Sequence, residues 1–246
     1  MPAAVQAYAD SGNLQAIRRI QEDITEFYRN DITRYCNERD VLLVKRIFDL
    51  MPAQLNQQNK RFIATSVGKD VRVGKDENRF IWLAEAGVAI PVCNVAEPRF
   101  PLMLAEEASL FKLFMSDVGL LAYGSGMEAV RGILGGKSVN YGGLYENYVA
   151  QELHAHGKRA WYYRSKKLGE LDFLIDWLSG KVLPIEVRSG KDYHRHRALR
   201  NVPEVDGWGL DEAVVLDDGN VEADGKTTYL PTYAAGWLDA FAGLEW

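Results

Sequence analysis

Residues 169–190 read GELDFLIDWLSGKVLPIEVRSG. Two segments, 171–177 and 182–189, alternate between apolar and polar residues, and the tetrapeptide LSGK separates them. This alternation around a short turn predicts a β-hairpin. If the turn is centred on its serine, Asp172 lies opposite Glu186, to within one residue.

Two carboxylates on neighbouring strands need a positive charge between them. Their Cβ atoms would be about 4.5–5.5 Å apart, a distance at which like charges repel. A hard divalent cation, Mg²⁺ or Mn²⁺, bound by Asp172, Glu186, water and phosphate would relieve the repulsion. Arg188 is expected on the same face, because side chains two residues apart on a strand point the same way. The alternatives are an ion cluster that Arg188 neutralises, or two solvated carboxylates.

The rest of the second half predicts a mixed sheet with helices. Residues 143–156 place their apolar side chains on one arc of a helix, and Glu146 lies at the margin of that arc, where it can reach the edge of a site. Further strands are expected at 160–164, 213–216 and 227–230, before a terminal helix with Trp237, Leu238 and Phe241. The fold class is therefore α/β, or α+β over the whole chain.

The first half predicts helices followed by two strands. Apolar residues at three- and four-residue spacing indicate helices at 13–35 and 40–51, and Pro52 is expected to close the second. A short helix at 66–69, a longer one at 76–86 with Gly87 as its C-cap, and strands at 88–95 and 110–115 follow in the order of a winged helix. We expect a helical and winged-helix-like domain at 1–122, a Gly/Ser-rich linker at 123–142 and a second domain at 143–246. The mixed charges of 75–79 favour a structural or protein-docking winged helix over one that reads DNA.

Three motifs in the second half resemble those of a known superfamily. Gly143-Leu144-Tyr145-Glu146-Asn147, Gly169-Glu170-Leu171-Asp172-Phe173 and Pro184-Ile185-Glu186-Val187-Arg188-Ser189-Gly190 are similar, in this order, to the PD-(D/E)xK nucleases, close to the Holliday-junction-resolvase-like members. The resemblance implies a restriction-endonuclease-like fold with Asp172 and Glu186 as direct metal ligands, and with Glu146 as a ligand or a support for one. Arg188 stands where the superfamily has Lys. An arginine stabilises charge but cannot act as a base, and Lys191 is the candidate to replace that lysine.

The first half resembles part of a second kind of protein. The motifs Trp82-Leu83-Ala84-Glu85-Ala86-Gly87 and 111–121, which read FKLFMSDVGLL, are similar to the region that follows the motor in a group of prokaryotic AAA-type ATPases. That group carries the same nuclease-like tail, so the resemblance spans nearly the whole chain. Gly136-Lys137-Ser138 imitates the end of a phosphate-binding loop, but Arg131 replaces its first glycine. We therefore expect no ATPase motor here, and either a fragment of a longer ATPase or a stand-alone relative with an ATPase partner.

Basic residues near the carboxylates are candidates for phosphate contacts. They are Arg164, Lys166, Lys167, Arg195, Arg197 and Arg200. The alternatives are a solvated helix face and a surface that binds a partner protein. The net charge of −5 means that any contact with DNA depends on such local patches.

Composition leaves two functional hypotheses. No apolar run reaches the length of a membrane span, and two distant cysteines indicate no disulfide framework, so a cytoplasmic protein is expected. The first hypothesis is a Mg²⁺- or Mn²⁺-dependent DNA phosphodiesterase with weak or absent activity. The second is a catalytically inactive docking or regulatory module for an ATPase or another protein.

Overall fold

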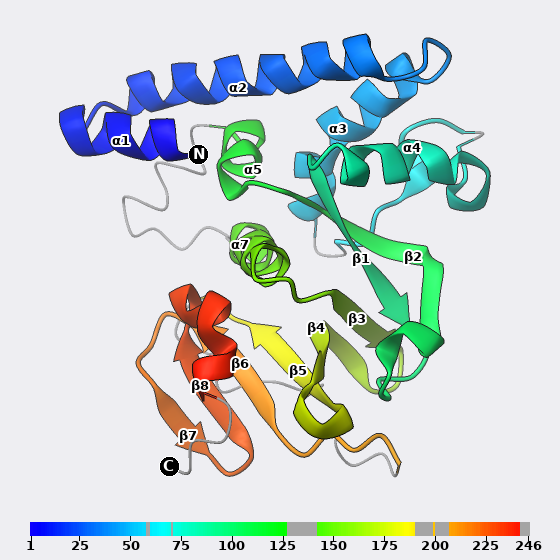
Figure 1. Ribbon diagram of the computed structural model, residues 1–246, viewed down its shortest axis with the longest axis vertical. Helices are drawn as coiled ribbons and strands as arrows, with labels where there is room; N and C mark the ends of the chain where they lie inside the picture. The colour runs from blue at the N-terminus through cyan, green and yellow to red at the C-terminus, as the bar shows by residue number, and fades with distance from the viewer. Residues whose placement is uncertain (58–59, 70, 127–141, 190–198, 200–206, 242–246) are drawn as a thin grey trace. The chain divides into compact units, whose positions relative to one another are not determined.

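The described residues form N-terminal helices and an eight-stranded mixed sheet (Figure 1). The computed structural model describes residues 1–57, 60–69, 71–126, 142–189, 199 and 207–241. By their internal contacts these residues fall into two compact units, one from Met1–Pro91 and Leu113–Val139, the other from Val92–Lys112 and Asn140–Trp246. No helix in the described ranges combines the length and the apolar character that crossing a bilayer requires.

In the first unit, the helices at residues 14–35, 41–55 and 73–85 follow the predicted periodicity, whereas those at 2–11 and 118–124 were not predicted and the short helix predicted at 66–69 is a 3₁₀ turn at 64–66. The helical elements of this unit are α1 (Pro2–Ser11), α2 (Leu14–Tyr35), α3 (Val41–Leu55), the 3₁₀ turn η1 (Ala64–Ser66), α4 (Val73–Glu85) and α5 (Val118–Gly124). The side chain of Asn13 accepts hydrogen bonds from the backbone N–H groups of Gln15 and Ala16, which fixes the start of α2. The C-cap of α4 is Ala86, and Gly87, predicted for that role, is the next residue, where its positive φ of 68° turns the chain out of the helix.

The predicted end of α3 is wrong, because Pro52 lies inside the helix. The helix continues to Leu55, which is buried, and to Gln54, whose side chain accepts a hydrogen bond from the Ile63 N–H at 2.6 Å and donates one to Ser66 Oγ at 2.6 Å. These tertiary contacts outweigh the backbone hydrogen bond that proline cannot make.

The sheet joins strands from both halves of the sequence. Its strands are β1 (Ala89–Val95), β2 (Glu106–Met115), β3 (Ala160–Ser165), β4 (Gly169–Trp177), β5 (Lys181–Val187), β6 (Ala213–Asp217), β7 (Glu222–Asp224) and β8 (Thr227–Pro231), in the order β2-β1-β3-β4-β5-β6-β8-β7. β3, β4 and β5 are antiparallel, whereas β1–β3, β5–β6 and β6–β8 are parallel. The two strands expected to form the wing therefore extend this larger sheet: Cys93 and Asn94 of β1 pair with Trp161 and Tyr162 of β3.

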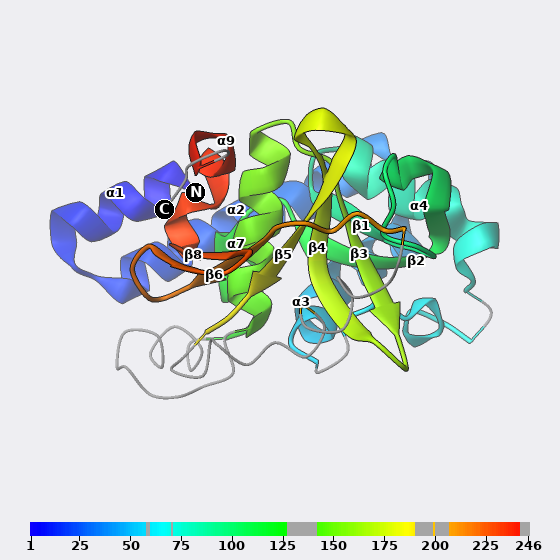
Figure 2. The ribbon, with the colours of Figure 1, turned by 90° about the horizontal axis from the view of Figure 1, so that it is seen from below.

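One face of the sheet carries a helical cover. α7 (Gly142–Ala155) contacts β3 and β5, and η4 (Thr232–Trp237), followed by α9 (Leu238–Phe241), contacts α7, β6 and β8; both views show α7 beside β5 (Figure 1, Figure 2). The predicted linker at 123–142 overlaps the end of α5, and its residues 127–141 lie outside the described ranges. The helix predicted at 143–156 and the hairpin predicted around LSGK are confirmed as α7 and β4–β5.

Candidate metal centre

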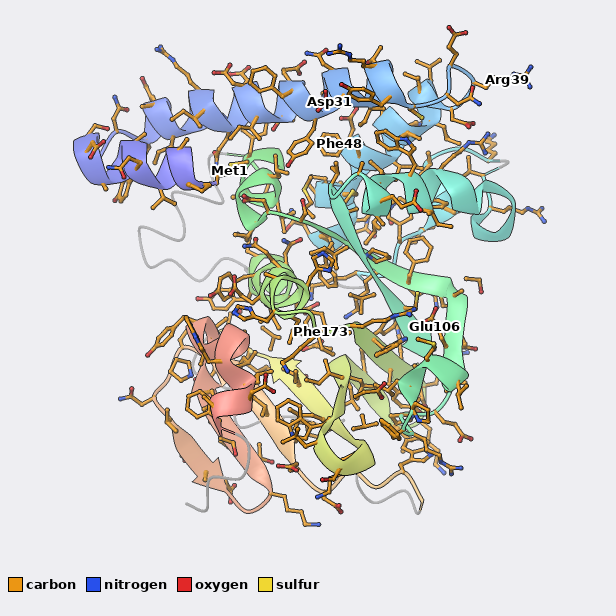
Figure 3. All side chains as sticks on the ribbon, viewed as in Figure 1. Met1, Asp31, Arg39, Phe48, Glu106 and Phe173 are labelled. Atoms are coloured by element: carbon orange, nitrogen blue, oxygen red, sulfur yellow. The ribbon has the colours of Figure 1, made fainter. Side chains whose placement is uncertain are left out.

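The β4–β5 hairpin brings Asp172 and Glu186 together. Phe173 pairs with Ile185, and one further step in this register places Asp172 beside Glu186, as the turn position predicted. The Asp172 carboxylate accepts a hydrogen bond from the Val187 N–H at 3.0 Å through Oδ2. Figure 3 labels Phe173, the buried neighbour of Asp172 on β4.

A β-bulge in β4 adjusts the position of Asp172. Trp161 of β3 pairs with Leu174, but Tyr163 pairs with Leu171, so β4 has one more residue than β3 in this interval. The extra residue falls in the segment that contains Asp172 and Phe173. Bulges redirect side chains and are frequent beside functional sites. Nothing in the local sequence pattern indicates this one.

The three predicted carboxylates are buried in one centre. Glu146 on α7 is 4% exposed, Asp172 is 9% exposed and Glu186 is 3% exposed. Buried carboxylates are stable as charged groups only when cations or hydrogen-bond donors surround them. The identity of these partners therefore decides what the centre can do.

Lys112 of β2 supplies the main positive charge. Its side chain is 1% exposed, and its Nζ lies 2.8 Å from Glu170 Oε1, 3.4 Å from Glu146 Oε2 and 4.0 Å from Asp172 Oδ1. The ammonium also lies 5.2 Å from the centre of the Tyr162 ring. Desolvation lowers the pKa of Lys112, but the three carboxylates raise it by more, so the pKa is above its ordinary value and the side chain is charged.

Arg188 pairs with Glu186 on the same face, as strand periodicity predicted. Its guanidinium donates a hydrogen bond to Glu186 Oε1. The other carboxylate oxygen, Oε2, is buried and has no hydrogen-bond partner in the described structure. Burial raises the pKa of Glu186 and the negative charge of Asp172 raises it further, while Arg188 opposes them; the pKa is well above its usual range.

The free energy of unfolding of the Glu186→Gln variant should increase relative to that of the wild type as pH rises. Because the pKa of Glu186 is raised in the native state, the folded protein binds this proton more tightly than the unfolded chain, whose pKa is about 4.3. Stability from this group is therefore present below about pH 4.3 and is lost as pH rises through the native pKa, at up to about 1.4 kcal/mol per pH unit. Urea unfolding of both proteins across this range measures the difference. Parallel stability curves would contradict the raised pKa.

The basic candidates for nucleic-acid contacts have different surroundings. Arg164 lies 3.5 Å from Glu170 in an ion pair, whereas Lys166 and Lys167 are exposed in the turn between β3 and β4. The remaining three, Arg195, Arg197 and Arg200, lie outside the described residues, as does Lys191, the candidate to replace the superfamily lysine.

The observed centre does not fit a bound divalent cation as it stands. In the described part of the chain, no three His, Cys, Asp or Glu side chains have the geometry to hold a metal ion. Mg²⁺ binds oxygen at about 2.1 Å and keeps several water ligands. Here the charged Nζ of Lys112 lies between Glu146 and Asp172 instead.

Lys112 was not among the predicted site residues, although the sequence around it indicates that its charge needs buried partners. This lysine lies within Leu110-Phe111-Lys112-Leu113-Phe114-Met115, a continuous apolar strand sequence, and a charge buried in such a strand requires partners. Glu170 also precedes Asp172 by two residues, which places both on one face of β4. The long-range contact between β2 and β4 residues, however, is a property of the tertiary structure.

The residues of this centre come from segments that match two different family models. The family model of a domain of unknown function, DUF8612, matches residues 1–131, and the chain belongs to this family. The model of a second domain of unknown function, DUF4143, an AAA-ATPase-associated C-terminal type of domain, matches residues 141–233. Lys112 thus comes from the first matched domain and Glu146, Asp172 and Glu186 from the second. No curated protein and no solved structure matches the chain.

Proposed function

We propose that this chain is the C-terminal part of an AAA-type ATPase-like protein, or a partner of such an ATPase, and that its PD-(D/E)xK-like domain is a docking or regulatory module without DNA-cleaving activity. The observation that carries this proposal is the buried position of Lys112 among Glu146, Glu170 and Asp172. The motifs shared with ATPase-associated proteins and the DUF4143 match support the partner class.

Metal-dependent hydrolysis needs more than a set of carboxylates. The metal must keep open positions for an attacking water and for a phosphate oxygen. In this centre an ammonium already satisfies Glu146 and Glu170, and Arg188 holds one oxygen of Glu186. Arg188 also cannot exchange a proton with water at accessible pH. The arrangement therefore favours a neutralised structural core over a working hydrolytic site.

A metal-dependent DNA phosphodiesterase is the second candidate. It is favoured by Glu186 Oε2, which is buried without a hydrogen-bond partner in the described structure and remains available as an acceptor. The two candidates differ in whether the wild-type protein binds metal and cleaves DNA.

We expect the purified wild-type protein to cleave none of three DNA forms: linear, branched and single-stranded, with Mg²⁺ or Mn²⁺. We also expect Mn²⁺ to leave its melting temperature unchanged, because a ligand stabilises only a state that binds it. The docking role is tested by titrating the protein into purified AAA-type ATPases of the source organism and measuring binding and the rate of ATP hydrolysis. Saturable binding to one of these ATPases is expected.

Asp172→Asn is the control for cleavage. Cleavage by the wild type that disappears in this variant would establish the phosphodiesterase and overturn the inactive module. Cleavage that persists in Asp172→Asn would come from a contaminating nuclease. The change of melting temperature with Mn²⁺ would then decide between the two candidates.

A further inference from the structure

We propose that a cavity between α2 and α4 is a binding site for a small organic ammonium ion. Aromatic side chains form part of its wall and two carboxylates lie beside them, all within the segment that matches the first family model. The site uses none of the residues of the Lys112 centre. The inference therefore goes beyond the proposed function and gives the helical part of the chain a ligand of its own.

Side chains from two helices line this cavity, whose volume is about 390 Å³. α2 contributes Tyr28, Asp31 and Tyr35, which share one face of the helix because residues three and four apart are neighbours there. α4 contributes Trp82 and Glu85, again three residues apart. Figure 3 labels Asp31 on α2. Ligand sites in proteins typically occupy about 300–1,000 Å³, so the cavity has room for a small molecule.

The aromatic rings of the wall are suited to bind a cation. The faces of tryptophan and tyrosine rings carry negative electrostatic potential and attract ammonium groups, tryptophan most strongly. Tyr28 and Trp82 are half-buried, so water screens this attraction less than it would at exposed rings. The Tyr35 ring already attracts a cation of this chain: the Arg34 guanidinium lies 5.4 Å from its centre, although Arg34 is not among the described residues that line the cavity.

The two carboxylates give the cavity a negative charge. Asp31 and Glu85 are exposed, and within the described part of the chain neither forms an ion pair with another side chain. The charge also reaches the aromatic wall: burial raises the pKa of Tyr28, and the charges of Asp117 and Asp31 raise it further, so this phenol is neutral at physiological pH. The cavity therefore favours a cation and disfavours an anion.

The combination of rings and carboxylates selects among cations. Mg²⁺ and Ca²⁺ take oxygen ligands and gain little from the faces of aromatic rings, so the cavity does not suit a hard metal ion. A planar guanidinium stacks on one ring face, whereas a rounded alkylated ammonium group contacts several rings at once. Rings that come from two separate helices therefore favour the ammonium, with its alkyl groups against the rings and its charge near the carboxylates.

The test measures the binding of choline to the full-length protein. Choline is the probe for the ammonium class, and the alcohol in which carbon replaces its nitrogen is an uncharged probe of the same shape. Isothermal calorimetry gives the affinity, and the Trp82 indole N–H resonance, assigned by its absence from Trp82→Leu, reports the place of binding. Choline is expected to shift this resonance saturably and to bind at least about tenfold more tightly than the alcohol, because the alcohol lacks the cation–π attraction.

Two double variants test the carboxylates. Asp31→Asn with Glu85→Gln keeps the shape of both side chains, and because both are exposed the fold should be retained. This variant is expected to bind choline about fivefold more weakly than the wild type. Glu22→Gln with Asp23→Asn is the matched control, since it removes the same charge from exposed residues of α2 that do not line the cavity. Its affinity for choline should equal that of the wild type.

Four results would overturn the inference. They are no saturable binding of choline by the wild type, equal affinities for choline and the alcohol, equal losses of affinity in the two double variants, and tighter binding of methylguanidinium than of choline. The last result would instead indicate a site for an arginine side chain of a partner protein. The cleavage and ATPase assays of the proposed function do not depend on any of these measurements, so the two proposals can fail separately.

Discussion

Replacing Lys112 by Met is expected to lower the free energy of unfolding by about 3–5 kcal/mol, the range for removing one member of a buried ion pair. Met retains much of the length of the side chain but removes the ammonium. Glu146, Glu170 and Asp172 then face one another with this countercharge missing, in a place where the lysine is 1% exposed. Urea denaturation at neutral pH measures the loss.

Neutralising the carboxylates should reverse much of that loss. The triple variant Lys112→Met, Glu146→Gln, Asp172→Asn removes two of the three charges that lost their partner, and neutral replacement of a buried ion cluster is often close to neutral for stability. Lys181→Met, at a side chain that is 41% exposed, should change stability by no more than about 0.5 kcal/mol. If Lys112→Met is as stable as the wild type, the ammonium does not stabilise the centre.

Phe173→Ala should cost about 3–5 kcal/mol, the range for truncating a buried aromatic side chain. Phe173 is fully buried on β4, where it pairs with Ile185 of β5, and Figure 3 labels it. Its removal leaves a cavity beside the strand that carries Asp172. Thermal and urea unfolding measure the effect, and the far-UV circular dichroism at low temperature shows whether the variant still folds.

Phe27→Ala is the control of the same chemistry. Phe27 lies on α2 with 67% of its surface exposed, so truncation should change stability by no more than about 0.5 kcal/mol. Equal losses in the two variants would mean that burial on β4 is not what makes Phe173 important. Such a result would also mean that the Phe27 side chain is buried in solution by contact with another molecule.

Elements that depend on nearby residues were predictable from the sequence. α2 and α7 follow from apolar side chains at helical spacing, and the β4–β5 hairpin follows from alternation around a short turn. The register of that hairpin is a local property, and it correctly placed Asp172 beside Glu186. Arg188 was likewise assigned to the face of Glu186 from strand periodicity alone.

Elements that depend on distant residues were missed or misplaced. The parallel pairing of β1 with β3 joins residues nearly seventy positions apart, as Cys93 and Trp161 show, and hydrophobic patterning does not reveal which strands become neighbours. The continuation of α3 past Pro52 depends on the contacts of Gln54 with Ile63 and Ser66. Tertiary packing decides the first feature, for which local patterning gives no preference, and outweighs the local preference of Pro52 in the second.

The sequence alone determined the local elements and the residues that carry carboxylates, because helix and strand periodicity and hairpin register act over short distances. The tertiary structure alone decided what balances these carboxylates. Lys112 lies 34 residues before Glu146 and reaches it only when β2 joins the sheet and α7 packs over it. Electrostatic neutralisation depends on distance in space, and no pattern of neighbouring residues specifies which cation a buried acidic centre receives.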